Sequence, residues 1–148
     1  MAYTLSLSTV ADSISKLSIS GVTVKDVDQL APAMTSNVLY PLPNGWITGA
    51  KFTPVTYGSN SGEQANFTCN MTYRFLGTLV GDMGAFNKAY SNVISKMTLI
   101  LNAILSNDVI TGAVDFRFVG VANIGPVSDP AGNMYHGCDL TFMYEEFL

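Results

Sequence analysis

One uninterrupted alternation of apolar and polar side chains constrains the fold of this chain more than any other feature of its sequence. Neighbouring side chains of a β-strand point to opposite faces, so such a pattern predicts a strand with one packed and one polar face. The apolar face of the sheet then needs a second layer to cover it. In residues 66–75, Phe67, Cys69, Met71, Tyr73 and Phe75 alternate with Asn66, Thr68, Asn70, Thr72 and Arg74.

A second strand is predicted before this one, over residues 46–57. Pro54 marks it as interrupted or as an edge strand, because proline cannot donate to the ladder of hydrogen bonds. The glycine- and serine-rich residues 58–62 predict a hairpin loop between the two strands. Short extended segments are expected at 22–24 and at 38–40, the latter because a proline follows it.

Two more strands are predicted nearer the end of the chain, over residues 110–122 and 134–147, because large apolar side chains again alternate with polar ones. Prolines and glycines make residues 124–133 a predicted loop between them. The segment from Gly77 to Gly81 is expected to close the alternating strand.

Two helices are expected. Residues 83–106 carry apolar side chains at helical spacing opposite a polar face, and Asp82 is a suitable N-cap. Residues 8–18 predict a short helix whose start resembles a capping box of Thr9 and Asp12.

We therefore expect a single domain over residues 1–148, of the α+β class. It should contain a mixed or antiparallel sheet of about four to five strands, one long helix on one face of that sheet, and the short N-terminal helix. A chain of 148 residues buries roughly 70% of the surface that it exposes when unfolded, which is enough for one core without disulfides or metal.

The low content of charged residues indicates which kind of surface the protein has. Only 12% of the residues are charged, about half of the usual ~25%, and Asn, Ser and Thr take the polar positions instead. This is typical of a subunit with broad polar contacts to its neighbours. The net charge is −4 and the seven Lys and Arg residues are scattered, so specific binding of DNA or RNA is not expected. We also expect no membrane span and no signal peptide.

No motif predicts catalysis, metal binding or cofactor binding, so we expect neither an enzyme nor a cofactor. His136 and Cys138 are two residues apart, but a zinc site would need more ligands at close spacing. Asn60 stands where a nucleophile elbow carries serine, and no phosphate-binding glycine loop is present. Cys69 and Cys138 fall on apolar strand faces and are expected to be buried thiols, with a disulfide between paired strands as the alternative.

Six residues are candidates for contacts between subunits. Aromatic side chains beside loops are common interface anchors, although packing within the chain is the alternative for each. The arginines are candidates because strand carboxylates such as Asp139 are expected to be solvated or to pair with them across an interface. The candidates are Trp46, Tyr57, Asn60, Arg74, Arg117 and Tyr135.

The order of these segments resembles that of small bacteriophage tail-terminator, or tail-to-head joining, proteins. The resemblance is one of arrangement, covers nearly the whole chain and involves no short diagnostic motif. It is carried by the helix at 8–18, the proline-rich stretch 38–43, the strand 68–75, the helix at 83–106 and the last strand pair, which ends in 139–144.

The resemblance implies a virion protein, made in the host cytoplasm, that forms a homohexameric ring on the end of the tail tube. The ring would dock to tail-tube and head-completion proteins, and DNA would pass through its lumen without specific binding. The loops at 58–62 and 124–133 would reach neighbouring subunits. Two alternatives stay open: another virion ring subunit, such as a tail-tube or head-closure protein, and a small-molecule-binding domain whose pocket is lined by Trp46, Tyr90 and Met97.

Overall fold

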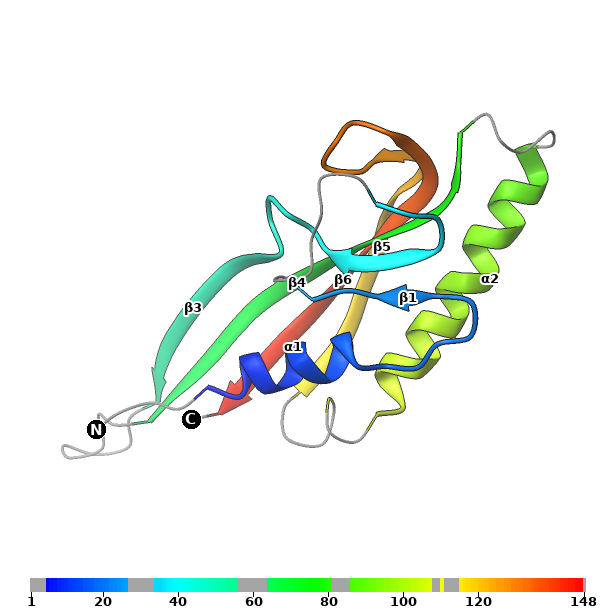
Figure 1. The fold of residues 1–148 in the computed structure, drawn as a ribbon. Helices are drawn as coiled ribbons and strands as arrows, with labels where there is room; N and C mark the ends of the chain where they lie inside the picture. Colours follow the sequence, from blue (N-terminus) through cyan, green and yellow to red (C-terminus); the bar gives the residue numbers. More distant parts are fainter. Residues whose placement is uncertain are drawn as a thin grey trace.

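The computed structural model describes residues 5–26, 34–55, 64–80, 86–107, 110 and 115–147. The predicted α+β class is confirmed, but the predicted number of strands is too low, because the short segments near 22–24 and 38–40 also join the sheet. The described elements are α1 (Leu7–Ser15), β1 (Thr23–Val24), β2 (Val38–Pro41), β3 (Ile47–Val55), β4 (Gln64–Leu79), α2 (Phe86–Leu105), β5 (Asp115–Ser128) and β6 (Met134–Phe147) (Figure 1).

β4 is the centre of one mixed sheet of six strands with the order β1-β2-β4-β6-β5. One edge of β4 pairs with β3 along its first half and with β2 along its second half, and the other edge pairs with β6. All pairs are antiparallel except β1 with β2, which are parallel. The predicted hairpin is confirmed as β3–β4, where Pro54 lies opposite Ala65 in what is, in the described sheet, an edge strand.

Both helices pack on one face of the sheet, which we call the inner face (Figure 1). The apolar side chains of the alternating stretch point to this face, and none of them is more than 4% exposed. The alternation therefore predicted the packed face correctly. The main core joins these side chains to Val10 and Ile14 of α1, Val93, Ile100 and Ile104 of α2, Phe116 of β5, and Leu140, Phe142 and Tyr144 of β6.

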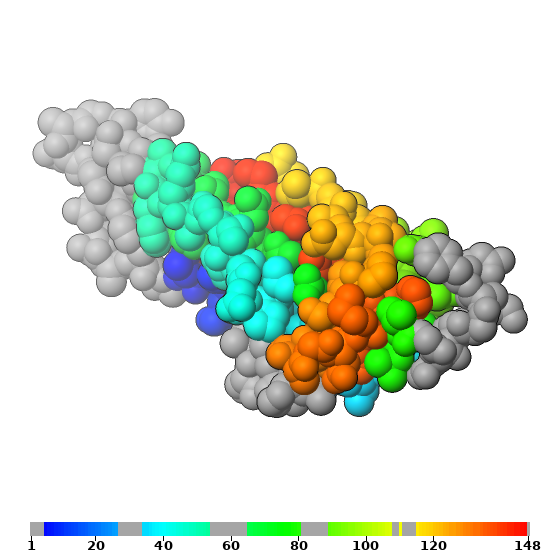
Figure 2. All heavy atoms as spheres, turned by 90° about the horizontal axis from the view of Figure 1, so that it is seen from above, coloured from blue at the N-terminus to red at the C-terminus, as the bar shows by residue number. Residues whose placement is uncertain are grey.

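The opposite face, which we call the outer face, shows β3, β4, β6 and β5 side by side (Figure 2). Its side chains on β4 are the polar partners of the alternation, and Thr72 bonds across to Thr141 of β6 at 3.2 Å. A smaller second core covers one end of this face. It consists of Met34, Val38, Tyr40, Leu76, Val127 and Tyr135.

β4 is longer than predicted, because Gly77 does not end it. The strand continues to Leu79 through an irregularity in its pairing with β6. A Cβ atom at Gly77 would lie 2.7 Å from the carbonyl oxygen of His136, so this glycine allows the two strands to approach closely where the ladder shifts.

β5 also corrects the sequence prediction, because it runs through the first half of the predicted loop at 124–133 and ends at Ser128. Two shifts in its register with β6 allow the strand to continue through these residues. Asn123 and Gly125 have φ angles of 55° and 145° at the second shift, where extra residues leave the ladder. Pro126 is tolerated because β5 pairs only with β6 among the described strands, so its other edge needs no amide donor there.

α1 begins and ends earlier than predicted, and the capping box of Thr9 and Asp12 is not formed. The N-cap is Ser6, and its side chain makes no capping bond. Instead both carboxylate oxygens of Glu146 accept hydrogen bonds from the Ser6 amide, at 3.0 and 2.9 Å. A negative charge at a helix N-terminus is stabilising. The long helix is confirmed as α2, whereas the predicted cap Asp82 lies outside the described residues.

Candidate functional site

A bidentate ion pair lies on the outer face of the sheet. Arg74 of β4 is directly opposite Asp139 of β6 and donates from Nε to Oδ1 at 2.7 Å and from Nη2 to Oδ2 at 2.9 Å. The two side chains are 18% and 5% exposed. Charge-assisted pairs of this geometry are among the strongest hydrogen bonds in proteins. The bond to Asp139 is also the main cause that raises the pKa of Arg74.

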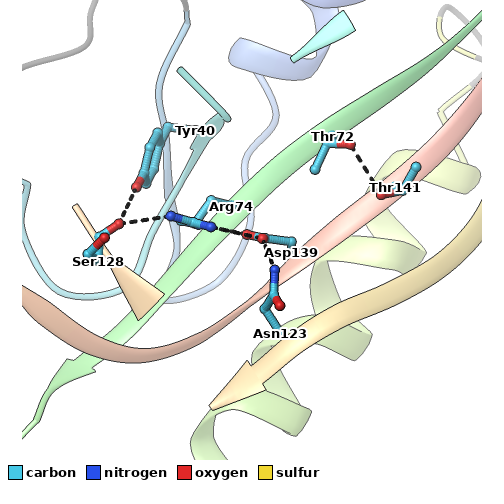
Figure 3. Close-up of polar contacts among 7 residues, drawn as sticks. All are labelled: Tyr40, Thr72, Arg74, Asn123, Ser128, Asp139 and Thr141. Atoms are coloured by element: carbon cyan, nitrogen blue, oxygen red, sulfur yellow. Dashed lines mark hydrogen bonds and ion pairs between the residues drawn. The ribbon is translucent and has the colours of Figure 1, made fainter. Parts of the chain in front are cut away.

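Three neighbours hold the ion pair in place (Figure 3). Nη1 of Arg74 donates to the carbonyl oxygen of Ser128 at 3.0 Å, and Nδ2 of Asn123 donates to Oδ2 of Asp139 at 2.8 Å. The hydroxyl of Tyr40 lies 3.5 Å from the same carbonyl oxygen. Burial raises the pKa of Tyr40 to about 12, so the phenol keeps its proton near neutral pH. The cluster thus joins β2, β4, β6 and the end of β5.

The turn between β5 and β6 is organised by one buried carboxylate, Asp129. Its Oδ1 accepts the backbone N–H groups of Ala131 and Asn133, at 3.0 and 2.8 Å. Its Oδ2 accepts the N–H of Met34 at 3.0 Å and Nδ2 of Asn133 at 3.1 Å. Burial alone would raise the pKa of Asp129, but these hydrogen bonds outweigh it and hold the pKa below its usual range.

Two adjoining hollows open on either side of Arg74 and Ser128. We call the larger one, of about 430 Å³, the Arg74 hollow; its walls are Tyr40, Leu42, Pro43, Asn44, Arg74, Ser128, Asp129 and Pro130. The smaller one, of about 310 Å³, is lined by Arg74, Asn123, Ile124, Gly125, Pro126, Val127, Ser128 and Met134. In Figure 2 the chain segments that form these walls meet on the outer face. Both hollows are lined by a mixture of polar and apolar groups.

The candidate interface residues do not gather in one place. Arg74 is at the centre of the cluster, whereas Tyr135 is buried in the second core and donates from its hydroxyl to the carbonyl oxygen of Met34 at 2.6 Å. Trp46 is half-buried against the main core. Arg117 is exposed on β5 and lies 3.4 Å from Asp115. The other two candidates, Tyr57 and Asn60, lie outside the described residues.

Sequence reasoning missed Asn123, Ser128 and Asp129. It placed Ser128 and Asp129 in a predicted loop and left Asn123 between that loop and the preceding strand. No local pattern marks a carbonyl oxygen or an amide as a partner of a distant ion pair. The Asp-Pro pair at 129–130 was a turn signal that could have drawn attention to Asp129, because aspartate side chains often bond to the backbone of their own turn. Asp139 was expected to be solvated or to pair across an interface, but it pairs with Arg74 within the chain.

Within the described ranges no group of three or more His, Cys, Asp or Glu side chains is placed to hold a metal ion. Cys69 and Cys138 are free and buried, which confirms the expected thiols rather than the disulfide. Burial raises their pKa values to about 11 and about 12, so they are poor nucleophiles. No helix in the described part of the chain is long and apolar enough to cross a membrane.

No protein-family model matches this chain, and no curated protein matches its sequence significantly.

Proposed function

We propose that this chain is a structural subunit of a homo-oligomeric ring that closes a bacteriophage tail tube and joins it to the head. The observation that carries the proposal is the outer face, which is broad, polar and poor in net charge. On its two central strands the charged side chains are the paired Arg74 and Asp139, together with Glu145. The centres of protein interfaces are depleted of unpaired charge in the same way.

The margins of the sheet favour contacts through loops and side chains over extension of the sheet from copy to copy. β3 carries a bulge between Thr48 and Lys51 and includes Pro54, while β5 carries two bulges and Pro126. Bulges, lysine and proline are the features by which edge strands avoid pairing with another strand. A subunit of this kind is expected to hold its neighbour by two different surfaces, and such a heterologous contact gives a ring when its rotation closes.

Native mass spectrometry combined with negative-stain imaging tests the proposal. We expect a closed oligomer, with six copies as the favoured number, and density at the head-proximal end of tail tubes after the protein is added. Density along the whole tube, or at the head portal alone, would instead support a tail-tube or head-closure subunit. A protein that stays monomeric at high concentration and does not bind tubes would contradict a ring of either kind.

A small-molecule-binding domain is the second class to be tested. Neither hollow on the outer face is lined by Trp46, Tyr90 or Met97, the residues suggested for its pocket. Trp46 and Met97 pack against the main core, and the ring of Tyr90 lies 6.0 Å from that of His136. A ligand-dependent rise in melting temperature for a monomeric protein would favour this class over the ring.

A further inference from the structure

We propose that Asn44 is a site of spontaneous modification, at which its side-chain amide is converted to a carboxylate through the backbone nitrogen of Gly45. The two residues form the one Asn-Gly pair of the sequence. They lie in the turn between β2, which ends at Pro41, and β3, which begins at Ile47. This inference goes beyond the proposed ring, because the reaction needs only this chain and water.

The reaction closes a five-membered ring within the chain, so the attacking and attacked groups are held near each other. The nitrogen of Gly45 gives its proton to solvent and forms a bond to Cγ of Asn44. The bond from Cγ to Nδ2 breaks, and Nδ2 takes up a proton and leaves as ammonia. Water then opens the succinimide. Cleavage of the new bond gives aspartate and cleavage of the original peptide bond gives isoaspartate, so either product carries one added negative charge and nothing is oxidised or reduced.

The structure leaves the attacked amide of Asn44 accessible. Its side chain is exposed and makes no hydrogen bond with another residue in the described part of the chain, so it can turn toward the backbone. Other asparagines of this region are held. Asn123 gives its amide to Asp139 at 2.8 Å, and Asn133 gives its amide to Asp129 at 3.1 Å.

Gly45 leaves the attacking nitrogen unhindered. Every other asparagine of the sequence is followed by a residue with a side chain, which would crowd the ring closure. Gly45 has a φ of 123°, a conformation that favours glycine. A Cβ atom there would have Thr48 and Leu42 as its nearest neighbours, at 3.8 and 3.9 Å, so the turn is open around it. Because the turn lies between two strands, no ladder hydrogen bond holds the N–H of Gly45.

The new carboxylate would change the charge of the Arg74 hollow, because Asn44 is one of its walls. Asp129 already contributes a negative charge to the same lining. Arg74 is the one cation among the described residues that line it, and Asp139 already neutralises this arginine. The modification therefore makes one end of the neutral outer face acidic as the protein ages.

Mass spectrometry of incubated protein tests the modification. Native and urea-unfolded wild-type proteins are kept at mildly alkaline pH, digested and mapped at successive times. We expect the peptide that contains Asn44 to gain the mass of an amide-to-acid exchange and to contain isoaspartate. In the native protein, exchange at Asn44 should be at least about tenfold faster than at Asn102, an exposed residue of α2 that precedes Ala103. It should also stay within about tenfold of the rate in the unfolded chain.

Asn44→Gln is the matched control, because its longer side chain would have to close a less favourable six-membered ring. This variant keeps a neutral amide and should show no exchange at position 44 over the same times. A smaller difference between Asn44 and Asn102, or a native rate further below the unfolded one, would overturn the proposal.

Sedimentation velocity measures the effect of the modification on self-association, and only this effect rests on the proposed ring. Incubated wild type and fresh Asn44→Asp should associate about threefold or more weakly than fresh wild type at low salt, whereas incubated Asn44→Gln should not. The peptide masses decide the modification whether or not copies associate, so a failure of the ring is distinguished from a failure of this inference. Exchange at Asn44 with unchanged association would confirm the modification and place Asn44 outside the contact between copies.

Discussion

The Arg74–Asp139 pair is nearly removed from solvent, so its two side chains stabilise the fold only as a pair. Arg74→Met would leave the Asp139 carboxylate buried with the amide of Asn123 as its remaining partner. We expect the free energy of unfolding, measured by urea titration, to fall by about 3–5 kcal/mol, because an unpaired buried charge is costly. The double variant Arg74→Met with Asp139→Leu should recover most of this loss. A loss below about 1 kcal/mol in the single variant would mean that solvent screens the pair.

Asp129 makes stability depend on pH in the acid range. Its hydrogen bonds favour the ionised carboxylate and hold its pKa below the usual range, so its contribution is complete above about pH 4 and is lost as the pH falls through the lowered pKa. Asp129→Asn should therefore melt at a lower temperature than the wild type at neutral pH, and the difference should shrink on acidification. Calorimetry across this range checks the prediction, and a difference that does not change with pH would contradict it.

Cys69 and Cys138 should be unreactive in the folded protein. Both thiols are buried on the inner face, and burial raises their pKa values to about 11 and about 12. At about pH 8 a thiol reagent should modify them at least ~100-fold more slowly than in the urea-unfolded chain. Rapid modification of the native protein would show that the region of the core between β4 and β6 opens easily.

At the scale of a single element, the contact between the start of α1 and the end of β6 can be tested directly. Glu146 accepts the amide of Ser6 and the hydroxyl of Tyr144, the latter at 2.6 Å. Glu146→Gln should reduce stability by about 1–3 kcal/mol, because hydrogen bonds to a charged acceptor are lost. Hydrogen exchange should rise in α1 but not in α2. Glu145→Gln, on the outer face next to it, is the matched control and should leave exchange in α1 unchanged.

Sequence reasoning predicted the elements in which apolar side chains recur at a regular spacing within one continuous stretch of the chain. The alternation of residues 66–75 identified β4 and its packed face, and helical spacing identified α2, because each pattern reports the single face that the element buries. The continuation of β5 to Ser128 could not be predicted in this way. Its register shifts hide the alternation, and the prolines and glycines that suggest a loop are tolerated on an edge strand.

The candidate site was predictable only in part, because its partners come from four different strands. Arg74 was found from the alternation, which placed it on the polar face of its strand. Its partners Asp139 and Ser128 depend on the pairing of β4 with β6 and on the continuation of β5 to Ser128, and neither is encoded in a short stretch of sequence. The missing capping box of α1 has the same cause, since Glu146 reaches the helix from the other end of the chain.

Taken as a whole, the molecule separates its two kinds of surface. On the inner face, both helices cover the apolar side chains of the sheet. The outer face is polar, and among the described residues the second core covers one end of it. Because its central charges are paired within the chain, this outer face offers a partner hydrogen bonds and shape rather than a strong electrostatic field. The low charge of the whole sequence fits this division.

A self-association that depends on such a surface should be nearly independent of salt. At 1 M ionic strength the Debye length falls to about 3 Å, which weakens contacts between exposed charges but affects neutral hydrogen bonds little. We therefore expect the dissociation constant between copies, measured by sedimentation velocity, to change by less than about threefold between low salt and 1 M salt. The charged variant Asn44→Glu, at the rim of the Arg74 hollow, should associate more weakly at low salt and recover part of the loss at high salt, because it adds a negative charge beside Asp129. A wild-type association that weakens more than about tenfold with salt would mean that exposed charges, and not the neutral outer face, hold the copies together.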